Sequence, residues 1–161
     1  MKMKTLTVNA IIAALYVTVS LALPMLSYGN IQFRIAEMFN HLIVFNKRYF
    51  FGIVAGVFIT NLFSPLGIYD LTFGVAHSII SLTIVLLIIP RLKTDTQKMI
   101  ANTIVFTFTT FIIAYELLLV LNLPFYLTWL TVAAGELVVL LVGIPIFKKL
   151  NERLDFAKLV E

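Results

Sequence analysis

Long apolar segments follow one another along almost the whole chain, separated only by short connections that contain proline, glycine or charged residues. A helix of about 20 apolar residues crosses the hydrocarbon core of a bilayer. In the 161-residue chain 61% of the residues are hydrophobic and only 12% are charged. This is too little polar surface to cover a water-soluble globule of this size. The sequence therefore predicts an all-α integral membrane protein whose main solvent is the lipid bilayer.

The breaks between these segments predict one domain, residues 1–161, that is a bundle of six transmembrane helices. We place the helices at about residues 5–23, 33–46, 49–63, 70–90, 99–121 and 126–147. The second and third are short for a full crossing, so we expect them to tilt or to be shielded by neighbouring helices. The first follows two lysines, as a signal peptide would, but its apolar run is long for a signal core. We therefore expect it to remain as a helix.

Basic residues occur in alternate connections along the chain. The connections between the predicted outer ends of helices, residues 24–32, 64–69 and 122–125, contain no lysine or arginine. The other connections and the two ends of the chain carry Lys2, Lys4, Lys47, Arg48, Arg91, Lys93, Lys98, Lys148, Lys149, Arg153 and Lys158. Because lysine and arginine concentrate in cytoplasmic loops, this pattern predicts a multi-pass protein of the cell membrane with both termini in the cytoplasm. A basic surface for nucleic acid is not indicated, because the basic residues separate apolar segments instead of gathering on one face.

Several polar residues fall in the predicted outer half of the membrane. Arg34, Glu37 and His41 are spaced at i, i+3 and i+7, which would place them on one stripe of an α-helix. Four further predicted helices contribute Asn61, Asp70, His77, Glu116 and Glu136. An ionisable side chain in the hydrocarbon region costs roughly 2.5–3.5 kcal/mol on insertion scales, so each one needs a partner or a ligand. Their common depth predicts a pocket open to the outside, and the apolar inner half argues against a continuous water-filled pore.

Some of these residues also have a structural interpretation. Arg34 and Glu37 are at a spacing at which they would neutralise each other on the helix surface. His41 and His77 would be satisfied by backbone carbonyls or by water. Asp70 would equally cap the start of the fourth helix. Sequence alone leaves ligand contact and these structural roles open.

Glu116 and Glu136 are the strongest ligand candidates, because no lysine or arginine is close to either in sequence. Their burial must be offset from another helix or by a ligand. Asn61 is ambiguous, since amide side chains also form hydrogen bonds between membrane helices. Ala10 and Ala14 form a small-xxx-small pair on the first helix. The pair fits close packing within the bundle or against a partner membrane protein.

Several common catalytic patterns are absent from the sequence. It contains no phosphate-binding loop of the form G-x-x-x-x-G-K-[ST], no nucleophile elbow, no H-E-x-x-H and no cysteine. The two histidines and Asp70 lack the spacing of a metal motif. We therefore expect no enzyme activity, no metal and no cofactor bound by this chain, and any ATP-driven step requires another subunit.

Three stretches carry a resemblance that runs through essentially the whole chain. They are Asn30-Ile-Gln-Phe-Arg-Ile-Ala-Glu37, Gly56-Val-Phe-Ile-Thr-Asn-Leu-Phe-Ser-Pro-Leu-Gly67 and Asp70-x-x-Phe-Gly74. They resemble the QueT family, whose members look like substrate-binding S components of energy-coupling factor (ECF) transporters. The resemblance implies a six-helix protein that captures its solute at the outer face. It also implies that Ala10 and Ala14 meet a transmembrane coupling subunit of the EcfT type, driven by two cytoplasmic ATPases that use ATP.

The resemblance further implies that the solute is a queuosine precursor, a 7-deazaguanine. Glu37, Glu116 or Glu136 would accept hydrogen bonds from the ring N–H and the exocyclic amine. Arg34 would donate to the ring carbonyl or orient a carboxylate, Gln32 and Asn61 would contact other edges, and aromatic faces would stack on the ring. Three alternatives stay open: another vitamin-like micronutrient, a stand-alone secondary transporter, and an intramembrane enzyme.

Overall fold

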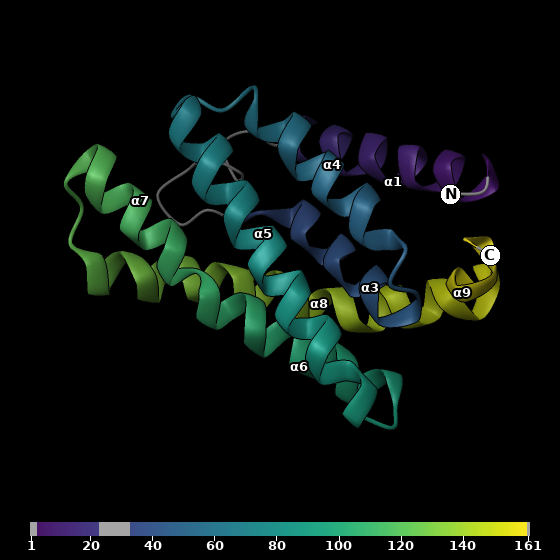
Figure 1. Ribbon diagram of the computed structural model, residues 1–161. Helices are drawn as coiled ribbons and strands as arrows, with labels where there is room; N and C mark the ends of the chain where they lie inside the picture. Colours follow the sequence, from purple (N-terminus) through teal and green to yellow (C-terminus); the bar gives the residue numbers. More distant parts are fainter. Residues whose placement is uncertain (1–2, 23–32, 161) are drawn as a thin grey trace.

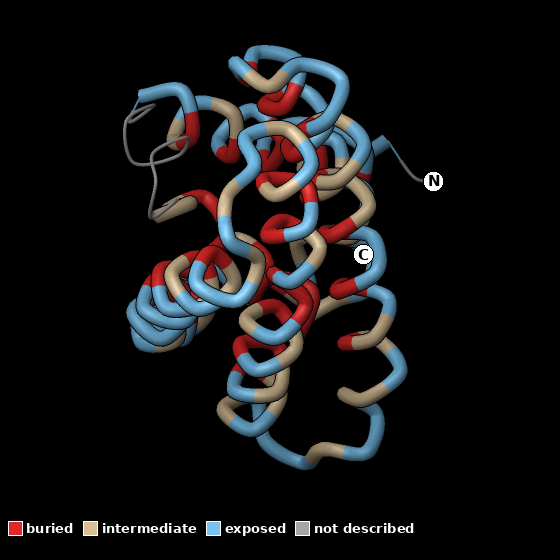
Figure 2. The backbone as a smooth tube through the Cα atoms, turned by 90° about the vertical axis from the view of Figure 1, so that its left-hand side faces the viewer, coloured by how far each residue is buried: buried red, intermediate tan, exposed pale blue. Residues whose placement is uncertain are grey.

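A computed structural model describes residues 3–22 and 33–160, which form helices and connecting turns without a β-strand (Figure 1). The helices are α1 (Met3–Ala22), η1 (Ile35–His41), α3 (Leu42–Phe45), α4 (Tyr49–Asn61), α5 (Ile68–Ile88), η2 (Ile89–Arg91), α6 (Asp95–Thr109), α7 (Phe111–Leu121), α8 (Phe125–Leu154) and α9 (Phe156–Leu159). Buried residues lie on the sides of the helices that face one another, and exposed residues lie outside (Figure 2). The predicted all-α class is confirmed.

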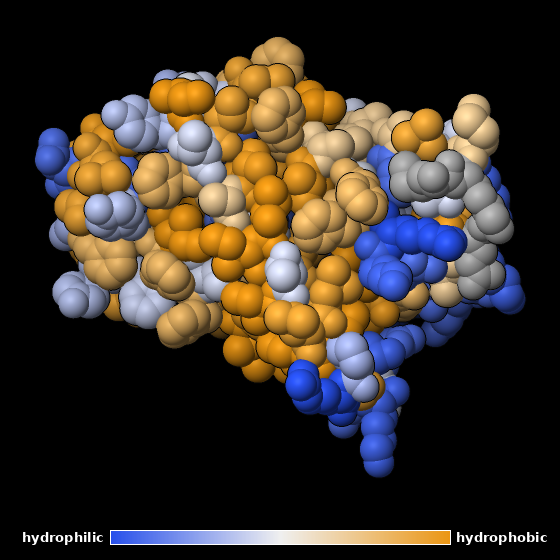
Figure 3. Space-filling view, in the orientation of Figure 1, coloured by the Kyte–Doolittle hydropathy of each residue, from blue (hydrophilic) through white to orange (hydrophobic). Residues whose placement is uncertain are grey.

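Four helical stretches are long and apolar enough to cross a bilayer, namely 3–22, 68–91, 95–121 and 125–154. Two shorter apolar stretches, Ile35–Phe45 and Tyr49–Asn61, correspond to the second and third predicted helices. Hydrophobic side chains cover the middle of the face in Figure 3, and hydrophilic ones gather toward the end where the two termini lie. The chain is therefore built as a multi-pass membrane protein.

The predicted helix at 99–121 begins earlier and is interrupted. A capping box starts α6 at Asp95: the Thr94 side chain accepts from the backbone of Gln97, and the Gln97 side chain accepts from the backbone of Thr94. The interruption falls at Thr110, between α6 and α7. Thr109 and Thr110 each donate a side-chain hydrogen bond to a carbonyl in the preceding turn. Such back-bonding bends helices, which accounts for the break.

The last long helix extends beyond its predicted end, to Leu154. Asp155 then adopts a left-handed backbone conformation with φ 47°, and the short helix α9 turns back toward α1. Lys4 Nζ donates to the Lys158 carbonyl at 2.8 Å, and Arg48 Nη1 donates to the Val160 carbonyl at 2.6 Å. Basic segments that are far apart in sequence therefore lie together at one end of the fold.

The pairing of α1 with α4 depends on two glycines. The Gly52 N–H donates to Asn9 Oδ1 at 2.8 Å, and a Cβ at Gly52 would lie only 2.6 Å from that same oxygen. A Cβ at Gly56 would lie 2.8 Å from Cβ of Tyr16. Larger residues would therefore separate the helices. Small residues at membrane helix interfaces permit this close approach.

Candidate functional site

An arginine at the start of η1 links two carboxylates from different parts of the chain. Arg34 Nη1 lies 3.9 Å from Glu37 Oε1, and Arg34 Nη2 lies 3.7 Å from Asp70 Oδ1. Both acidic side chains are buried, whereas the Arg34 side chain keeps 11% of its exposed area. The expected neutralisation of Glu37 by Arg34 is therefore observed, but Arg34 also reaches α5. The Arg34 side chain is therefore more exposed than either of the carboxylates that it contacts.

The segment that carries Arg34 and Glu37 is a 3₁₀-helix over residues 35–41, and not the predicted α-helix. A 3₁₀-helix has three residues per turn, so side chains at i and i+3 are aligned. Arg34, Glu37 and Asn40 follow this period, and the Asn40 amide donates to Glu37 Oε2. His41 is four residues from Glu37, and its ring contacts Leu140 of α8 and Asn102 of α6 instead of the Glu37 side chain. The predicted stripe of Arg34, Glu37 and His41 was therefore wrong in its last member.

Glu37 also receives a hydrogen bond from α1. The Tyr16 hydroxyl donates to Glu37 Oε1 at 2.9 Å, and both side chains are buried. Tyr16, Arg34 and Asn40 together surround the carboxylate with donors from two elements. Hydrogen bonds to a carboxylate are stronger than those between neutral groups, so this arrangement fixes the position of Glu37.

Asp70 faces Arg34 and does not cap its helix. The N-cap of α5 is Gly67, with φ 58°, a left-handed conformation that glycine adopts without steric cost. The Asp70 carboxylate accepts from the Ser64 hydroxyl, and the Asn61 amide donates to the Asp70 backbone carbonyl at 3.0 Å. The capping interpretation of Asp70 was therefore wrong. Asn61 has the structural role of joining α4 to α5.

Glu116 on α7 and Glu136 on α8 complete the cluster. Their relative exposures are 0% and 2%. Within the described part of the chain, both carboxylate oxygens of Glu116 and Oε1 of Glu136 have no hydrogen-bond partner. Glu116 is close enough to interact electrostatically with Asp70 and Arg34, and Glu136 with Glu37 and Arg34. The surroundings of these two carboxyl groups therefore include members of the cluster, but three of their four oxygens find no hydrogen-bond partner among the described residues.

The two histidines have mainly structural surroundings. His41 Nε2 lies 2.9 Å from the Leu140 carbonyl, and its Nδ1 lies 3.3 Å from the Asn102 amide. His77 Nε2 lies 3.1 Å from the Thr109 hydroxyl, and its Nδ1 has no hydrogen-bond partner among the described residues. His41 therefore packs η1 against α8, while His77 joins α5 to α6 and leaves one ring nitrogen free. Gln32, also predicted to contact a ligand, lies outside the described residues.

The cluster therefore contains four carboxyl groups, Glu37, Asp70, Glu116 and Glu136, and one guanidinium. No three histidine or acidic side chains in residues 3–22 and 33–160 converge closely enough to hold a metal ion. Tyr16, Asn40 and Ser64 belong to the cluster through their hydrogen bonds, and the sequence reasoning missed them. The only sequence signal for them is the three-residue spacing of Asn40 from Glu37.

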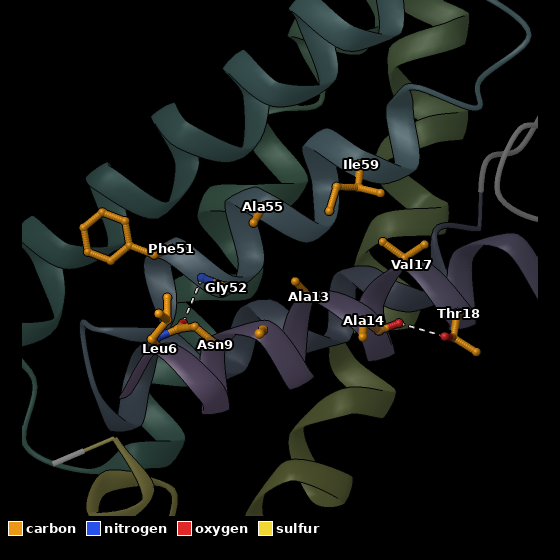
Figure 4. A pocket seen from close by; sticks show the side chains of 11 residues that line it. Leu6, Asn9, Ala13, Ala14, Val17, Thr18, Phe51, Gly52, Ala55 and Ile59 are labelled. Atoms are coloured by element: carbon orange, nitrogen blue, oxygen red, sulfur yellow. Dashed lines mark hydrogen bonds between the residues drawn. The ribbon is translucent and has the colours of Figure 1, made fainter. Parts of the chain in front are cut away.

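A second feature is a groove between α1 and α4, on the side of this helix pair that faces away from the other helices (Figure 4). It has a volume of about 670 Å³ and is lined mainly by small and apolar residues, among them Ala10, Ala13, Ala14 and Ala55. Ala10 and Ala14 are exposed, so the predicted small-residue pair faces away from the bundle. Gly52 and Asn9, joined by their hydrogen bond, line one end of the groove. The packing of α1 inside the protein thus uses Asn9 and Tyr16. The face of α1 that carries Ala10 and Ala14 is left without a partner among the described residues.

Helices of spanning length around a buried polar cluster define a multi-pass membrane protein with a candidate solute site between its helices. The model of the QueT transporter family matches residues 6–152. The chain is also similar to the queuosine precursor transporter QueT of Lactococcus lactis subsp. cremoris (strain MG1363), with 37% identity over 158 residues, which cover 92% of this chain and 93% of the relative. No solved structure gives a significant match. The chain belongs to the QueT transporter family, and it is a transporter and not an enzyme.

Proposed function

We propose that the chain is the S component of an ECF importer and that it captures a queuosine precursor, a 7-deazaguanine, from outside the cell. The observation that carries this proposal is the buried cluster around Arg34, in which Glu116 and Glu136 lack hydrogen-bond partners among the described residues. Ionisable groups within a membrane protein commonly mark a solute pathway. The name of the Lactococcus lactis relative supplies the solute class.

The orientation of the chain in the membrane follows from the end of the fold where the basic residues gather. Lys4, Arg48 and Lys158 lie together there, and Lys148 Nζ donates to the Thr96 hydroxyl at 2.9 Å, which brings the start of α6 to the same end. By the positive-inside rule this end is cytoplasmic. Both termini are then inside, all six helical segments contribute to one domain that crosses the membrane, and the carboxyl cluster opens to the outside.

The chemistry of the cluster suits a guanine-like edge. A carboxylate accepts two parallel hydrogen bonds, one from a ring N–H and one from an exocyclic amine. Glu116 and Glu136 have oxygens that no described residue satisfies, which leaves them available for this contact, and Glu37 is held in place by Tyr16 and Asn40. Arg34 donates to the ring carbonyl from the partly exposed side of the cluster. Further proposed ligand contacts are Gln32, Asn61, Asp70 and His77.

Energy for uptake comes from partner subunits in this account. The sequence contains no phosphate-binding loop. In the proposal, two cytoplasmic ATPases therefore use the ATP, and the chain itself binds no cofactor. The exposed Ala10 and Ala14 face of α1 meets the transmembrane coupling subunit. The small side chains allow helices to approach closely in lipid.

Uptake of a labelled queuosine precursor by cells tests this proposal. We expect uptake when the chain is co-expressed with the coupling subunit and ATPases, and none when it is expressed alone. Ala14→Leu fills the groove and should abolish uptake while leaving ligand binding by the purified chain intact. Ala134→Leu, at an exposed alanine of α8 away from the groove, is the matched control. Gradient-driven flux by the chain alone would contradict the S-component role.

A further inference from the structure

A further groove lies between α1 and α8, and it shares no lining residue with the groove in Figure 4. Its volume is about 570 Å³, and residues of α1, η1, α8 and α9 supply most of its lining. Among these residues, Leu42 and Phe147 are buried, whereas Ile11, Leu15 and Leu150 are exposed. This α1–α8 groove therefore extends from the core of the bundle to its surface.

The α1–α8 groove is apolar along its length. The hydroxyl of Tyr49 is the one polar side-chain group among the described residues that line it, and this hydroxyl donates to the Phe156 carbonyl at 2.8 Å. The groove thus offers no free polar group to a polar solute. If it stayed empty, its lining would forfeit van der Waals contacts. In a multi-pass membrane protein, the material at hand to fill such a groove is a hydrocarbon chain.

The length of the α1–α8 groove matches one leaflet of a bilayer. On α1 its lining residues recur at helical spacing and form one stripe, from Val8 through Ile11, Ile12 and Leu15 to Val19. At about 1.5 Å per residue, the eleven residue steps from Val8 to Val19 extend about 16 Å. One leaflet contributes half of a hydrocarbon core of about 30 Å, which is about 15 Å. An acyl chain of one leaflet is therefore long enough to occupy the groove.

Positive charge gathers at one end of the α1–α8 groove. Lys4 lies about one helical turn before the first lining residue of α1, on the same stripe, and its Nζ donates to the Lys158 carbonyl at 2.8 Å. Arg153 is the neighbour of Leu154, a lining residue of α8. Lys4 and Arg153 are exposed, and neither forms an ion pair with a carboxylate of the described residues, whereas Lys158 pairs with Asp155. The charges of Lys4 and Arg153 are therefore available to an external anion.

We propose that the α1–α8 groove holds one acyl chain of an anionic phospholipid from the leaflet at the basic end of the fold, and that Lys4 and Arg153 contact the phosphate of its headgroup. The apolar lining complements the chain, and the two cations complement the charge, since anionic lipids attract lysine and arginine at a membrane surface. No residue that lines the groove belongs to the carboxyl cluster, so the lipid site does not depend on which solute the chain carries. Because the lipid contacts α1, η1 and α8 together, its binding stabilises the fold.

The test is native mass spectrometry of the full chain, purified in detergent and titrated with phosphatidylglycerol or phosphatidylcholine that carry the same acyl chains. We expect the anionic phosphatidylglycerol to bind more tightly by about tenfold or more, because each basic residue near a headgroup contributes about fivefold. Lys4→Gln and Arg153→Gln should each reduce this preference by about fivefold. Lys93→Gln, at an exposed site between η2 and α6, is the matched control and should leave it unchanged.

A second pair of variants tests the groove itself. Leu15→Trp places a larger side chain in the groove and should weaken the binding of both lipids, and it should also remove the rise in thermal midpoint that phosphatidylglycerol gives the wild-type chain. Leu130→Trp, at a residue of α8 that is 67% exposed and does not line the groove, should behave as the wild type. Size-exclusion chromatography shows whether each variant is folded.

Three results would overturn the lipid site. The first is equal binding of the two lipids by the wild-type chain, a comparison that needs no variant. The second is an unchanged preference for phosphatidylglycerol in both Lys4→Gln and Arg153→Gln. The third is full lipid binding by folded Leu15→Trp. If that variant also lost its association with a coupling subunit or with a second copy of the chain, the groove would be a protein interface instead.

Discussion

The hydrogen bond from Tyr16 to Glu37 offers a single-atom test of how the cluster is held. The hydroxyl is buried, lies 2.9 Å from Glu37 Oε1 and connects α1 to η1. A hydrogen bond to a charged group contributes about 1.5–3 kcal/mol. Tyr16→Phe removes only this oxygen, because the ring can keep its packing against Gly56 and Phe39. We therefore expect the variant to lose about 2 kcal/mol of stability, or about 4–8 °C in thermal midpoint.

The assay is thermal unfolding of the purified variant in detergent, followed by size-exclusion chromatography. Tyr126→Phe is the matched control, because the Tyr126 side chain is 76% exposed and its hydroxyl should contribute little. Ligand affinity should also fall in Tyr16→Phe, since Glu37 loses a donor that fixes its position. If Tyr16→Phe were as stable as Tyr126→Phe, the hydroxyl would not stabilise Glu37 and this account of the cluster would be refuted.

Three further substitutions test other parts of the structure. Glu37→Gln keeps the side-chain volume but removes a charge facing Arg34, so ligand affinity measured by titration should fall while expression is retained; unchanged affinity would exclude Glu37 from the site. Gly56→Leu places a Cβ 2.8 Å from that of Tyr16 and should cost about 1–3 kcal/mol or more, seen as a lower thermal midpoint. Thr94→Ala removes the N-cap of α6 and should cost about 1 kcal/mol in the same assay, whereas a neutral result would mean that the capping box adds nothing.

The helical segments could be predicted because apolar runs and their breaks directly reflect burial in lipid. The first and last long helices, for example, begin within two residues of their predicted starts. Details that depend on local hydrogen bonds could not be predicted in this way. The break at Thr110 arises from side-chain bonds of neighbouring threonines, and the 3₁₀ geometry of residues 35–41 changes which side chains are aligned.

The ionisable members of the cluster were predictable because a buried charge is rare and conspicuous in an apolar sequence. Arg34, Glu37, Asp70, Glu116 and Glu136 were all selected on this ground, and the structure brings them together. The neutral donors were not conspicuous. Tyr16 looks like an ordinary membrane tyrosine, and Ser64 like a loop residue, until the fold brings each one to a carboxylate.

The central claim is that the buried cluster binds a 7-deazaguanine. The most direct measurement is a titration of the purified wild-type chain with 7-deazaguanines, with guanine as the comparison and Glu136→Gln as the variant. The account predicts saturable binding of at least one 7-deazaguanine and weaker binding of that compound by Glu136→Gln. Saturable binding that is unchanged in the variant would place the ligand elsewhere, and no binding by the folded chain would contradict the account.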